Sequence, residues 1–340
     1  MEERVNRRWR LAEYPEGLPK ETTFRLSVEP VPDPGPGQVL VRALYLSVDP
    51  YQRGRMHTRR SYARPMEIGD VIVGGTVGQV EASRHPAFPP GSFVEGLLGW
   101  QEYALSDGGD LRRLDLAPEL LPASLGVLGM PGLTAYFGLL DVGRPKAGET
   151  VVISGAAGAV GTVVGQIAKI QGCRAVGIAG SDDKVDVLVR ELGFDAAFNY
   201  KTAADVRGAL LDACPGGIDI YFDNVGGSIT DAAISLINLR ARVVICGQIS
   251  QYNLTKPARG PRNLTAFLTN RAMLQGILVT DWEDRYGEGL NQLAVWLREG
   301  RLKSHETVVE GFESAPVAFI GLFHGHNTGK MLVKVAEPRI

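Results

Sequence analysis

A glycine-rich turn is the clearest chemical motif in this 340-residue chain. It follows a short apolar stretch and precedes a run with helical periodicity, and its spacing is GxxGxxG rather than the strict GxGxxG. A helix N-terminus offers unpaired N–H groups to an anion, and glycines let the main chain approach a phosphate. A turn that serves packing alone would look similar, but the strand–turn–helix context favours a dinucleotide pyrophosphate site. We assign to it Gly155, Gly158, Ala159, Val160 and Gly161.

The end of the next predicted strand indicates which dinucleotide binds. NAD sites place an acid about 20 residues after the turn, on the ribose 2′-hydroxyl. Here the strand ends in Ala-Gly-Ser at residues 179–181, and Asp182 and Asp183 follow. These acids could fill that role, but carboxylates also suit the first turn of a helix. Ser181 and Lys184 would suit a 2′-phosphate, although Lys184 could be an ordinary solvated lysine. We therefore expect NADPH.

The elements that position this site predict a Rossmann fold. From residue 149 to about 300, strand-like and helical segments alternate, which is typical of a doubly wound parallel sheet. We expect strands at 150–154, 174–179, 218–223, 242–246 and 276–279, and helices after residues 159, 181 and 284. A chain of this length predicts two domains. We place the nucleotide-binding domain at 128–303 and a β-rich domain at 1–127, completed by 304–340.

The β-rich region contains apolar and β-branched runs separated by turn signals. Strands are expected at 38–46, 71–80, 92–99 and 102–105. The tail, residues 312–335, reads as short strand-like segments that rejoin this first domain.

Composition excludes several classes of function. The net charge of -2 gives no reason to expect nucleic acid or an anionic membrane surface as a partner. No apolar run approaches the length of a membrane span, and the first ten residues do not resemble a secretion signal. The three cysteines, Cys173, Cys214 and Cys246, are scattered, which favours a reducing cytoplasm over a disulfide framework.

Further motifs give the chain a recognisable pattern. It resembles the zinc-independent medium-chain dehydrogenase/reductases, and within them the leukotriene B4 dehydrogenase/prostaglandin reductase and alkenal double-bond reductase group. The segments that carry this resemblance are 6–9, 46–56, 128–136, 165–169, 180–184, 193–195, 198–200, 222–227, 246–253 and 325–330.

The resemblance implies a GroES-like catalytic domain, a Rossmann domain with the active site in the cleft between them, and a homodimer. Lys184 and Tyr200 would contact the 2′-phosphate. The remaining cofactor contacts would come from Asn224, Cys246, Gly247, Ser250, Tyr252 and Asn327. Tyr252 would also lie at the substrate carbonyl.

The resemblance also implies that Tyr51 and Met130 line the substrate pocket. Gln52 departs from it, because many relatives have Met there, and this departure bears on substrate shape. Without the resemblance, Tyr51 and Tyr252 would be ordinary amphipathic tyrosines, and Asn224 and Asn327 would be turn residues.

No zinc site is expected. Zinc needs three or four Cys, His or carboxylate ligands, and no cysteine precedes Cys173. Ser47 and the tripeptide at 69–71 occupy the positions of the usual zinc ligands, and the five histidines are scattered.

Without zinc, reduction of a conjugated double bond is the expected chemistry. The implied substrates are small enones and enals, including compounds like curcumin and 15-oxo-prostaglandins. A hydride goes to the β carbon, and a hydroxyl from Tyr252 or the cofactor ribose steadies charge on the carbonyl oxygen. Two alternatives remain: a quinone reductase of the same branch, and a non-catalytic NADPH-binding protein.

Overall fold

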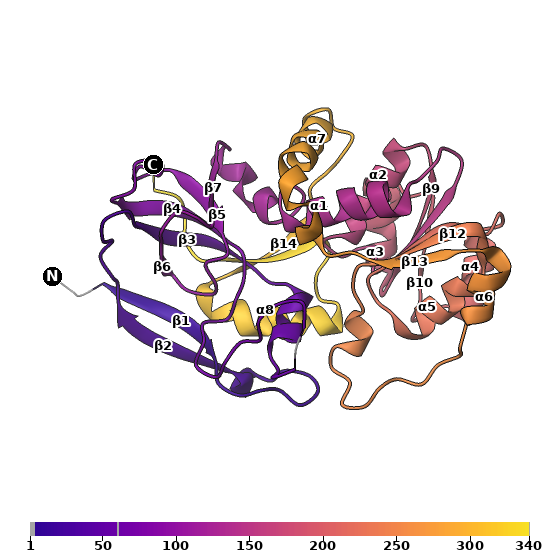
Figure 1. Ribbon diagram of the computed structural model, residues 1–340, viewed down its shortest axis with the longest axis horizontal. Helices are drawn as coiled ribbons and strands as arrows, with labels where there is room; N and C mark the ends of the chain where they lie inside the picture. Colours follow the sequence, from indigo (N-terminus) through magenta and orange to yellow (C-terminus); the bar gives the residue numbers. More distant parts are fainter. Residues whose placement is uncertain (1–3, 60, 340) are drawn as a thin grey trace. The chain divides into compact units, whose positions relative to one another are not determined.

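The computed structural model describes residues 4–59 and 61–339, which form two compact units. One unit comprises Gly126–His305 with Thr328–Lys330, and the other comprises the chain up to Leu125, Glu306–Asn327 and the segment from Met331 onward. Figure 1 shows the elements of each unit, which are described separately below.

The unit that contains the glycine turn is built on a six-stranded, fully parallel sheet. Its strand order is β10-β9-β8-β11-β12-β13. This order is the 3-2-1-4-5-6 of a Rossmann sheet, so the predicted fold class is confirmed. The strands are β8 (Thr150–Ser154), β9 (Arg174–Ala179), β10 (Ala196–Asn199), β11 (Ile218–Asp223), β12 (Ile237–Ile245) and β13 (Met273–Gly276).

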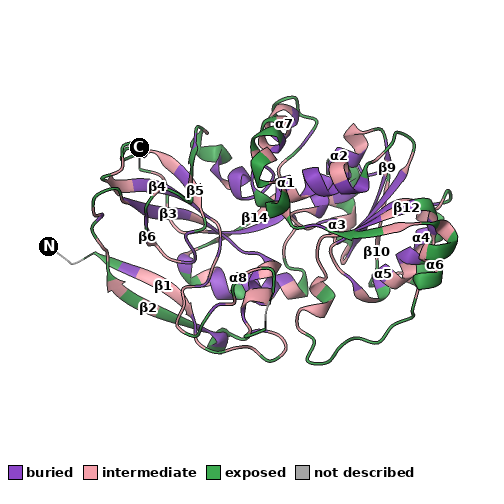
Figure 2. Cartoon of the chain, viewed as in Figure 1, coloured by how far each residue is buried: buried purple, intermediate pink, exposed green. Residues whose placement is uncertain are grey.

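Helices cover both faces of this sheet (Figure 1). On one face α1 (Met130–Phe137) contacts α2 (Gly161–Ile170) and α7 (Tyr286–Arg298), and α3 (Asp182–Asp186) continues into η5 (Val187–Glu191). On the other face α4 (Val206–Ala213), α5 (Gly227–Ile234) and α6 (Leu264–Asn270) pack on apolar strand residues. The strands of this sheet are largely buried, as around β9 (Figure 2). Burial on both sides explains why the middle of β8, residues 151–153, is an uninterrupted apolar run.

Glycines follow two of these helical segments, and a serine caps the start of α3. α2 ends before Gly172, which has a φ of 76°, and the turn after η5 uses Gly193 at 74°. Both values lie in the left-handed region that favours glycine at helix ends. Ser181 caps α3, because its hydroxyl accepts a hydrogen bond from the Lys184 amide.

The second unit is β-rich and has a seven-stranded sheet and a two-stranded sheet. Its helix α8 (Ala315–His324) contributes to the main apolar cluster around Trp100 and Phe319. The first sheet has the order β14-β15-β3-β4-β5-β7, and β6 pairs with β3. The strands are β1 (Val5–Leu11), β2 (Phe24–Pro30), β3 (Val39–Ser47), β4 (Thr76–Ser83), β5 (Phe93–Gly96), β6 (Tyr103–Ser106), β7 (Leu111–Leu114), β14 (Glu306–Glu310) and β15 (Lys330–Lys334).

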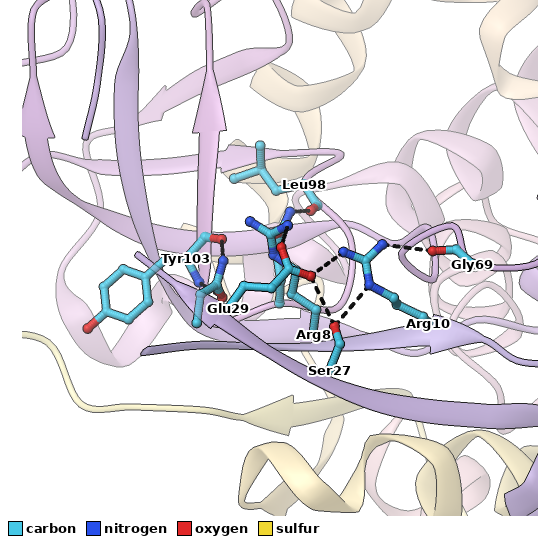
Figure 3. Close-up of polar contacts among 9 residues, drawn as sticks. Arg8, Arg10, Ser27, Glu29, Gly69, Leu98 and Tyr103 are labelled. Atoms are coloured by element: carbon cyan, nitrogen blue, oxygen red, sulfur yellow. Dashed lines mark hydrogen bonds and ion pairs between the residues drawn. The ribbon is translucent and has the colours of Figure 1, made fainter. Parts of the chain in front are cut away.

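The hairpin of β1 and β2 is fastened by a polar cluster (Figure 3). The Glu29 carboxylate accepts hydrogen bonds from Arg8 at 2.7 Å and from Arg10 at 2.5 Å. Asn6 is fully buried and exchanges two hydrogen bonds with the main chain of Tyr103. The Asn6 side-chain amide, which both donates and accepts, thus links β1 to β6 where no main-chain pairing does. This gives the motif at 6–9 a structural role.

Several sequence predictions are wrong in detail. The strand expected at 242–246 is β12 at Ile237–Ile245, and the one expected at 92–99 is β5 at Phe93–Gly96. The last strand of the parallel sheet is β13 at Met273–Gly276, not 276–279, and the strand expected at 71–80 is β4 at Thr76–Ser83. The tail contains α8 as well as a strand. The sequence of α8 is apolar apart from His324, so apolar residues lie on every face and no amphipathic period marks a helix.

Within residues 4–59 and 61–339, no single helix has the length and apolarity needed to cross a membrane. Two successive helical segments, Pro118–Leu125 and Met130–Gly143, meet that criterion only when they are taken together.

Two helical glycines predict opposite effects on stability. A Cβ on Gly165 in α2 would lie 1.8 Å from Cζ of the buried Phe194, whereas a Cβ on Gly287 in α7 would meet nothing within 4 Å. Gly165→Ala should lower the free energy of unfolding by about 1–3 kcal/mol through overpacking. Gly287→Ala should raise it by at most about 1 kcal/mol through helix propensity. Urea denaturation followed by circular dichroism measures both, and equal or inverted effects would contradict the packing described here.

Candidate functional site

The glycine turn joins β8 to α2 at the carboxyl edge of the parallel sheet. The Gly158 amide donates to the Gly155 carbonyl at 2.9 Å, and Gly155 has a φ of 57°. A Cβ on Gly161 would lie 2.4 Å from the Gly155 carbonyl oxygen and 2.7 Å from Cα of Ala156. The third glycine is therefore required by close packing of the turn on the start of α2. This arrangement leaves main-chain amides at a helix N-terminus, where a pyrophosphate can bind.

The returning tail contacts the same turn. The Gly329 amide donates to the Ala157 carbonyl at 2.8 Å, and Gly329 forms a parallel bridge with Gly158. A Cβ on Gly329 would lie 1.9 Å from the His305 carbonyl oxygen, so the close approach requires glycine here. Asn327 precedes Gly329 by two residues in the sequence, and its contact with the cofactor stays a prediction.

The expected ribose end of the site lies after β9. Asp182 and Asp183 occupy the first turn of α3, as expected from the sequence. The Asp182 carboxylate accepts a hydrogen bond from Asn199 Nδ2 at 2.9 Å. The Ser181 hydroxyl accepts one from the Lys184 amide at 3.4 Å. The acids thus serve the helix start and the neighbouring strand, and the serine and lysine lie together.

A second lysine, which the sequence analysis missed, adjoins this site. Burial lowers the pKa of Lys184, and the nearby charge of Lys201 lowers it further. A Cβ on Gly180 would lie 3.2 Å from the Tyr200 ring and 3.4 Å from Cε of Lys201, so both side chains lie against the end of β9. Two cations held near one another, beside the hydroxyls of Ser181 and Tyr200, form a site for a dianion.

The loops after β11 and β12 interlock with the start of the glycine turn. Asn224 donates its main-chain amide to Ser154 Oγ at 2.9 Å and its side-chain amide to the Ser154 carbonyl at 2.8 Å. The amides of Cys246 and Gly247 donate to the Asp223 carbonyl at 2.9 and 3.0 Å. The carboxyl ends of β8, β11 and β12 are therefore joined where the strand order reverses, which is the usual ligand crevice of such sheets.

Ser250 and Cys246 contribute to these loops in different ways. Ser250 donates its hydroxyl to the Val225 carbonyl at 2.7 Å, so it ties the loop after β12 to the loop after β11. Burial, together with the nearby Asp223, raises the pKa of the Cys246 thiol to about 12. A thiol that stays protonated is a poor nucleophile, so the chemistry available to Cys246 is that of its main chain.

Tyr252 follows the short helix η6 (Ile249–Gln251), and its hydroxyl points back at its own loop. The Gln248 amide donates to the Tyr252 hydroxyl oxygen at 3.3 Å. A Cβ on Gly247 would lie 3.2 Å from this oxygen and 3.5 Å from the Asn224 carbonyl oxygen. The structure thus brings Tyr252, Gly247 and Asn224 together at the carboxyl edge of the sheet.

Met130 belongs to the same unit as these loops. It is the first residue of α1, 40% exposed, and its carbonyl accepts a hydrogen bond from Thr134 Oγ1 at 2.8 Å. Exposure at a helix start leaves the side chain able to contact a ligand.

Tyr51 and Gln52 lie in the β-rich unit, in the short helix η2 (Pro50–Arg55). Burial raises the pKa of Tyr51 well above its ordinary value, and Asp49 raises it further, so the phenol stays protonated. Gln52 is fully buried: its side chain accepts from the Asp49 amide at 2.9 Å and donates to the Val73 carbonyl at 2.5 Å. The Gln52 side chain therefore holds its loop by internal hydrogen bonds. It can affect a ligand only through the position of that loop.

Ser47, at a position where zinc-dependent relatives have a metal ligand, makes a hydrogen bond within the protein. Ser47 donates its hydroxyl to the Asp49 carboxylate. Over residues 4–59 and 61–339, no group of three or more His, Cys, Asp or Glu side chains could hold a metal ion.

Sequence reasoning missed Lys201 and the polar residues around Asp223. Lys201 follows β10, which was not predicted because its strand signal is only four residues long. Ser154 and Asp223 are fully buried polar residues at the carboxyl ends of β8 and β11. That position at the carboxyl edge was a usable signal.

Comparison with known proteins places the chain in a family. Residues 7–114 match the model described as the N-terminal domain of oxidoreductase, and residues 159–294 match the one described as zinc-binding dehydrogenase. The chain is 47% identical over 336 residues to the NADPH-dependent curcumin reductase of Escherichia coli, covering 97% of each chain. It is 42% identical over 341 residues to the NADP(+)-dependent 2-alkenal reductase of Nicotiana tabacum, covering 99% of each.

A solved structure agrees with these relatives. CurA from Vibrio vulnificus in complex with NADPH is 46% identical, with a TM-score of 0.93 over 98% of this chain and 100% of that one. The chain therefore belongs to the zinc-independent medium-chain dehydrogenase/reductases, in the group that contains the curcumin, prostaglandin and 2-alkenal reductases.

Proposed function

We propose that this chain reduces the carbon–carbon double bond of α,β-unsaturated ketones and aldehydes with NADPH. The observation that carries the proposal is the cation pair of Lys184 and Lys201 on the same sheet edge as the glycine turn and Tyr252. The names of the relatives, which include an NADPH-dependent reductase and a 2-alkenal reductase, support the same cofactor and the same bond.

The residues present fit NADPH. Gly155, Gly158 and Gly161 bring main-chain amides to the pyrophosphate, with Ala159 and Val160 at the start of α2. Ser181, Lys184 and Tyr200 hold the 2′-phosphate, and we add Lys201 to them. Asn224, Cys246, Gly247, Ser250 and Asn327 follow the cofactor towards its nicotinamide end. When bound, NADPH supplies the hydride.

Tyr252 is the residue that acts on the substrate. Its hydroxyl donates a hydrogen bond to the carbonyl oxygen, where negative charge develops as the β carbon is reduced. The bond from the Gln248 amide uses a lone pair of the hydroxyl oxygen, so it is compatible with donation of the hydrogen. A proton from Tyr252, the ribose hydroxyl or water then completes the product at the α carbon.

Tyr51 and Met130 complete the proposal as substrate-lining residues, and no metal takes part in it. The β-rich unit acts as the catalytic domain, and the unit of the glycine turn acts as the nucleotide-binding domain.

We also propose that the chain is a cytoplasmic homodimer. β13 ends the strand order of the parallel sheet, and beside it Leu264, Leu268 and Leu274 are more than half exposed. An edge strand pairs readily with a copy of itself in antiparallel orientation, and exposed leucines gain from burial there. Light scattering after size-exclusion chromatography measures the association state.

The activity itself is tested by substrate choice. NADPH should be consumed with a simple enal or enone, and the product should be the saturated carbonyl compound. A quinone should be reduced much more slowly. Faster turnover of the quinone would favour a quinone reductase, and NADPH binding without turnover of any of these compounds would favour a binding protein.

Lys184→Ala tests the choice of cofactor. Loss of a charge-assisted contact to the 2′-phosphate should raise the Michaelis constant for NADPH by roughly ten- to a hundredfold and leave that for NADH nearly unchanged. Lys169→Ala, which removes a lysine paired with Asp195 near the other end of α2, is the control. Because the pKa of Lys184 is lowered, NADPH affinity of the wild type should begin to fall at a lower pH than an ordinary lysine would cause. Equal effects on NADPH and NADH would refute the assignment.

Tyr252→Phe tests the role in chemistry. The variant removes only the hydroxyl, so turnover of a strong enone should fall by about tenfold or more. NADPH binding, measured by direct titration, should weaken less than turnover falls. Folding should be little affected, because Tyr252 is half-buried rather than part of the core. Wild-type turnover would reduce Tyr252 to a residue that lines the site.

A further inference from the structure

A buried carboxylate lies next to the residue at which the glycine turn begins. Asp223 ends β11, is fully buried, and receives five hydrogen bonds from neutral donors. Those that reach Oδ1 come from Ser154 Oγ at 2.8 Å, Tyr221 Oη at 3.1 Å, and the amides of Val225 at 3.0 Å and Gly226 at 2.9 Å. Oδ2 accepts from Thr230 Oγ1 at 2.7 Å. Such a set of donors can hold a buried anion without a cation.

One of these donors also serves the cofactor loops. The single hydrogen of Ser154 Oγ is directed at Asp223, so the oxygen turns a lone pair towards the Asn224 amide, which donates to it at 2.9 Å. The carboxylate therefore sets the direction of the serine hydroxyl, because a carboxylate oxygen can only accept.

Asn224 in turn contacts both neighbouring loops, the glycine turn and the loop after β12. Its Cβ lies 3.4 Å from the Cβ position of Gly155, the first glycine of the turn. Its carbonyl oxygen accepts from the Ile249 amide at 3.3 Å, in the loop that carries Tyr252. A shift of the Asn224 main chain would therefore displace both the glycine turn and the loop that carries Tyr252.

Tyr221 offers a matched comparison. Its hydroxyl donates to the same Oδ1 and lies 3.1 Å from Thr230 Oγ1, and it is fully buried in the apolar cluster under α4, α5 and α6. It thus makes the same kind of bond to Asp223 as Ser154 does, but none to Asn224.

We propose that Ser154 is a positioning residue whose hydroxyl, oriented by the Asp223 carboxylate, holds Asn224 and so presets the loops that bind the dinucleotide. This inference rests on the proposed function for its ligand, NADPH, but its readout is binding rather than turnover. Asp223, Ser154 and Asn224 lie at the part of the sheet edge proposed for the pyrophosphate and nicotinamide, which NADPH and NADH share. Loss of the Ser154 hydroxyl should therefore weaken binding of both cofactors, unlike loss of Lys184.

The test compares Ser154→Ala with Tyr221→Phe, each of which removes one buried hydroxyl donor to Asp223. Both should lower the denaturation midpoint by similar amounts. Ser154→Ala should raise the dissociation constants for NADPH and NADH by about five- to tenfold, the worth of one hydrogen bond, whereas Tyr221→Phe should leave both nearly unchanged. The Michaelis constant for NADPH should rise with dissociation, and turnover at saturating NADPH should stay close to the wild type.

Two further variants keep the outcome decisive. Ser154→Thr retains the hydroxyl and should restore affinity, while Ser154→Cys replaces it with a weak thiol donor and should not. If the alanine variant does not fold, the cysteine variant takes its place. Unchanged affinity without the hydroxyl, or equal weakening in Tyr221→Phe, would overturn the proposal. If the wild type binds NADPH but reduces no enone, only the proposed activity fails, and if it binds no dinucleotide both fail.

Discussion

Between β8 and β11 the strand order of the parallel sheet reverses, and the main chains that leave these strands depart to opposite faces. The pairing of β8 with β11 ends at Ile153 and Phe222, so Ser154 and Asp223 keep ladder partners only on β9 and β12. A buried polar group that faces the junction between β8 and β11 must find a partner elsewhere. Asp223 provides it: its carboxylate gathers donors from β8, from the loop after β11 and from α5, and its carbonyl gathers the amides after β12. The glycine turn and the loops after β11 and β12 all begin at this junction or beside it.

Close approach of main chains is the second constraint on the site. The turn packs on α2 so tightly that Gly161 has no room for a side chain, and the tail reaches the turn only because Gly329 has none either. These contacts fix the amides before any ligand arrives, so binding need not order them. They also explain why a segment from the far end of the sequence belongs to the unit of the glycine turn.

Electrostatics divides the sheet edge into two parts. At the end of β9, the acids of α3 are engaged by the helix start and by Asn199, and Lys184 and Lys201 are left as neighbours of like charge. Burial lowers the pKa of Lys184, and the charge of Lys201 lowers it further. A phosphate dianion bound here would offset both effects, so this part of the edge suits a phosphate. At the ends of β11 and β12, by contrast, main-chain groups and neutral hydroxyls dominate, as suits the uncharged end of a nicotinamide cofactor.

The sequence by itself determined the fold class, the strand–turn–helix context of the glycines and the positions of Ser181, Lys184 and Tyr252. The role expected of Tyr252 came from the family resemblance, and the rest follows from local signals: the apolar period, a helix cap, and glycines at left-handed positions. The motifs at 198–200 and 222–227 also identified the family without any coordinates. Boundaries of short or edge strands were less predictable, as the shift of β13 to Met273–Gly276 shows, because a strand of four residues carries little periodicity.

Only the tertiary structure decided which polar residues act together. Ser154 and Asp223 are 69 residues apart in the sequence, and Gly329 is also far from Ala157 in the sequence. Each pair is nevertheless joined by a hydrogen bond in the folded chain. Lys201 became visible beside Lys184 only because β10 lies next to β9 in the sheet. α8 is apolar apart from His324, and apolar residues lie on its exposed side as well, as Val317 does, so the sequence shows no contrast between faces and no helical period. Pairings of this kind depend on strand order, which local sequence patterns do not encode.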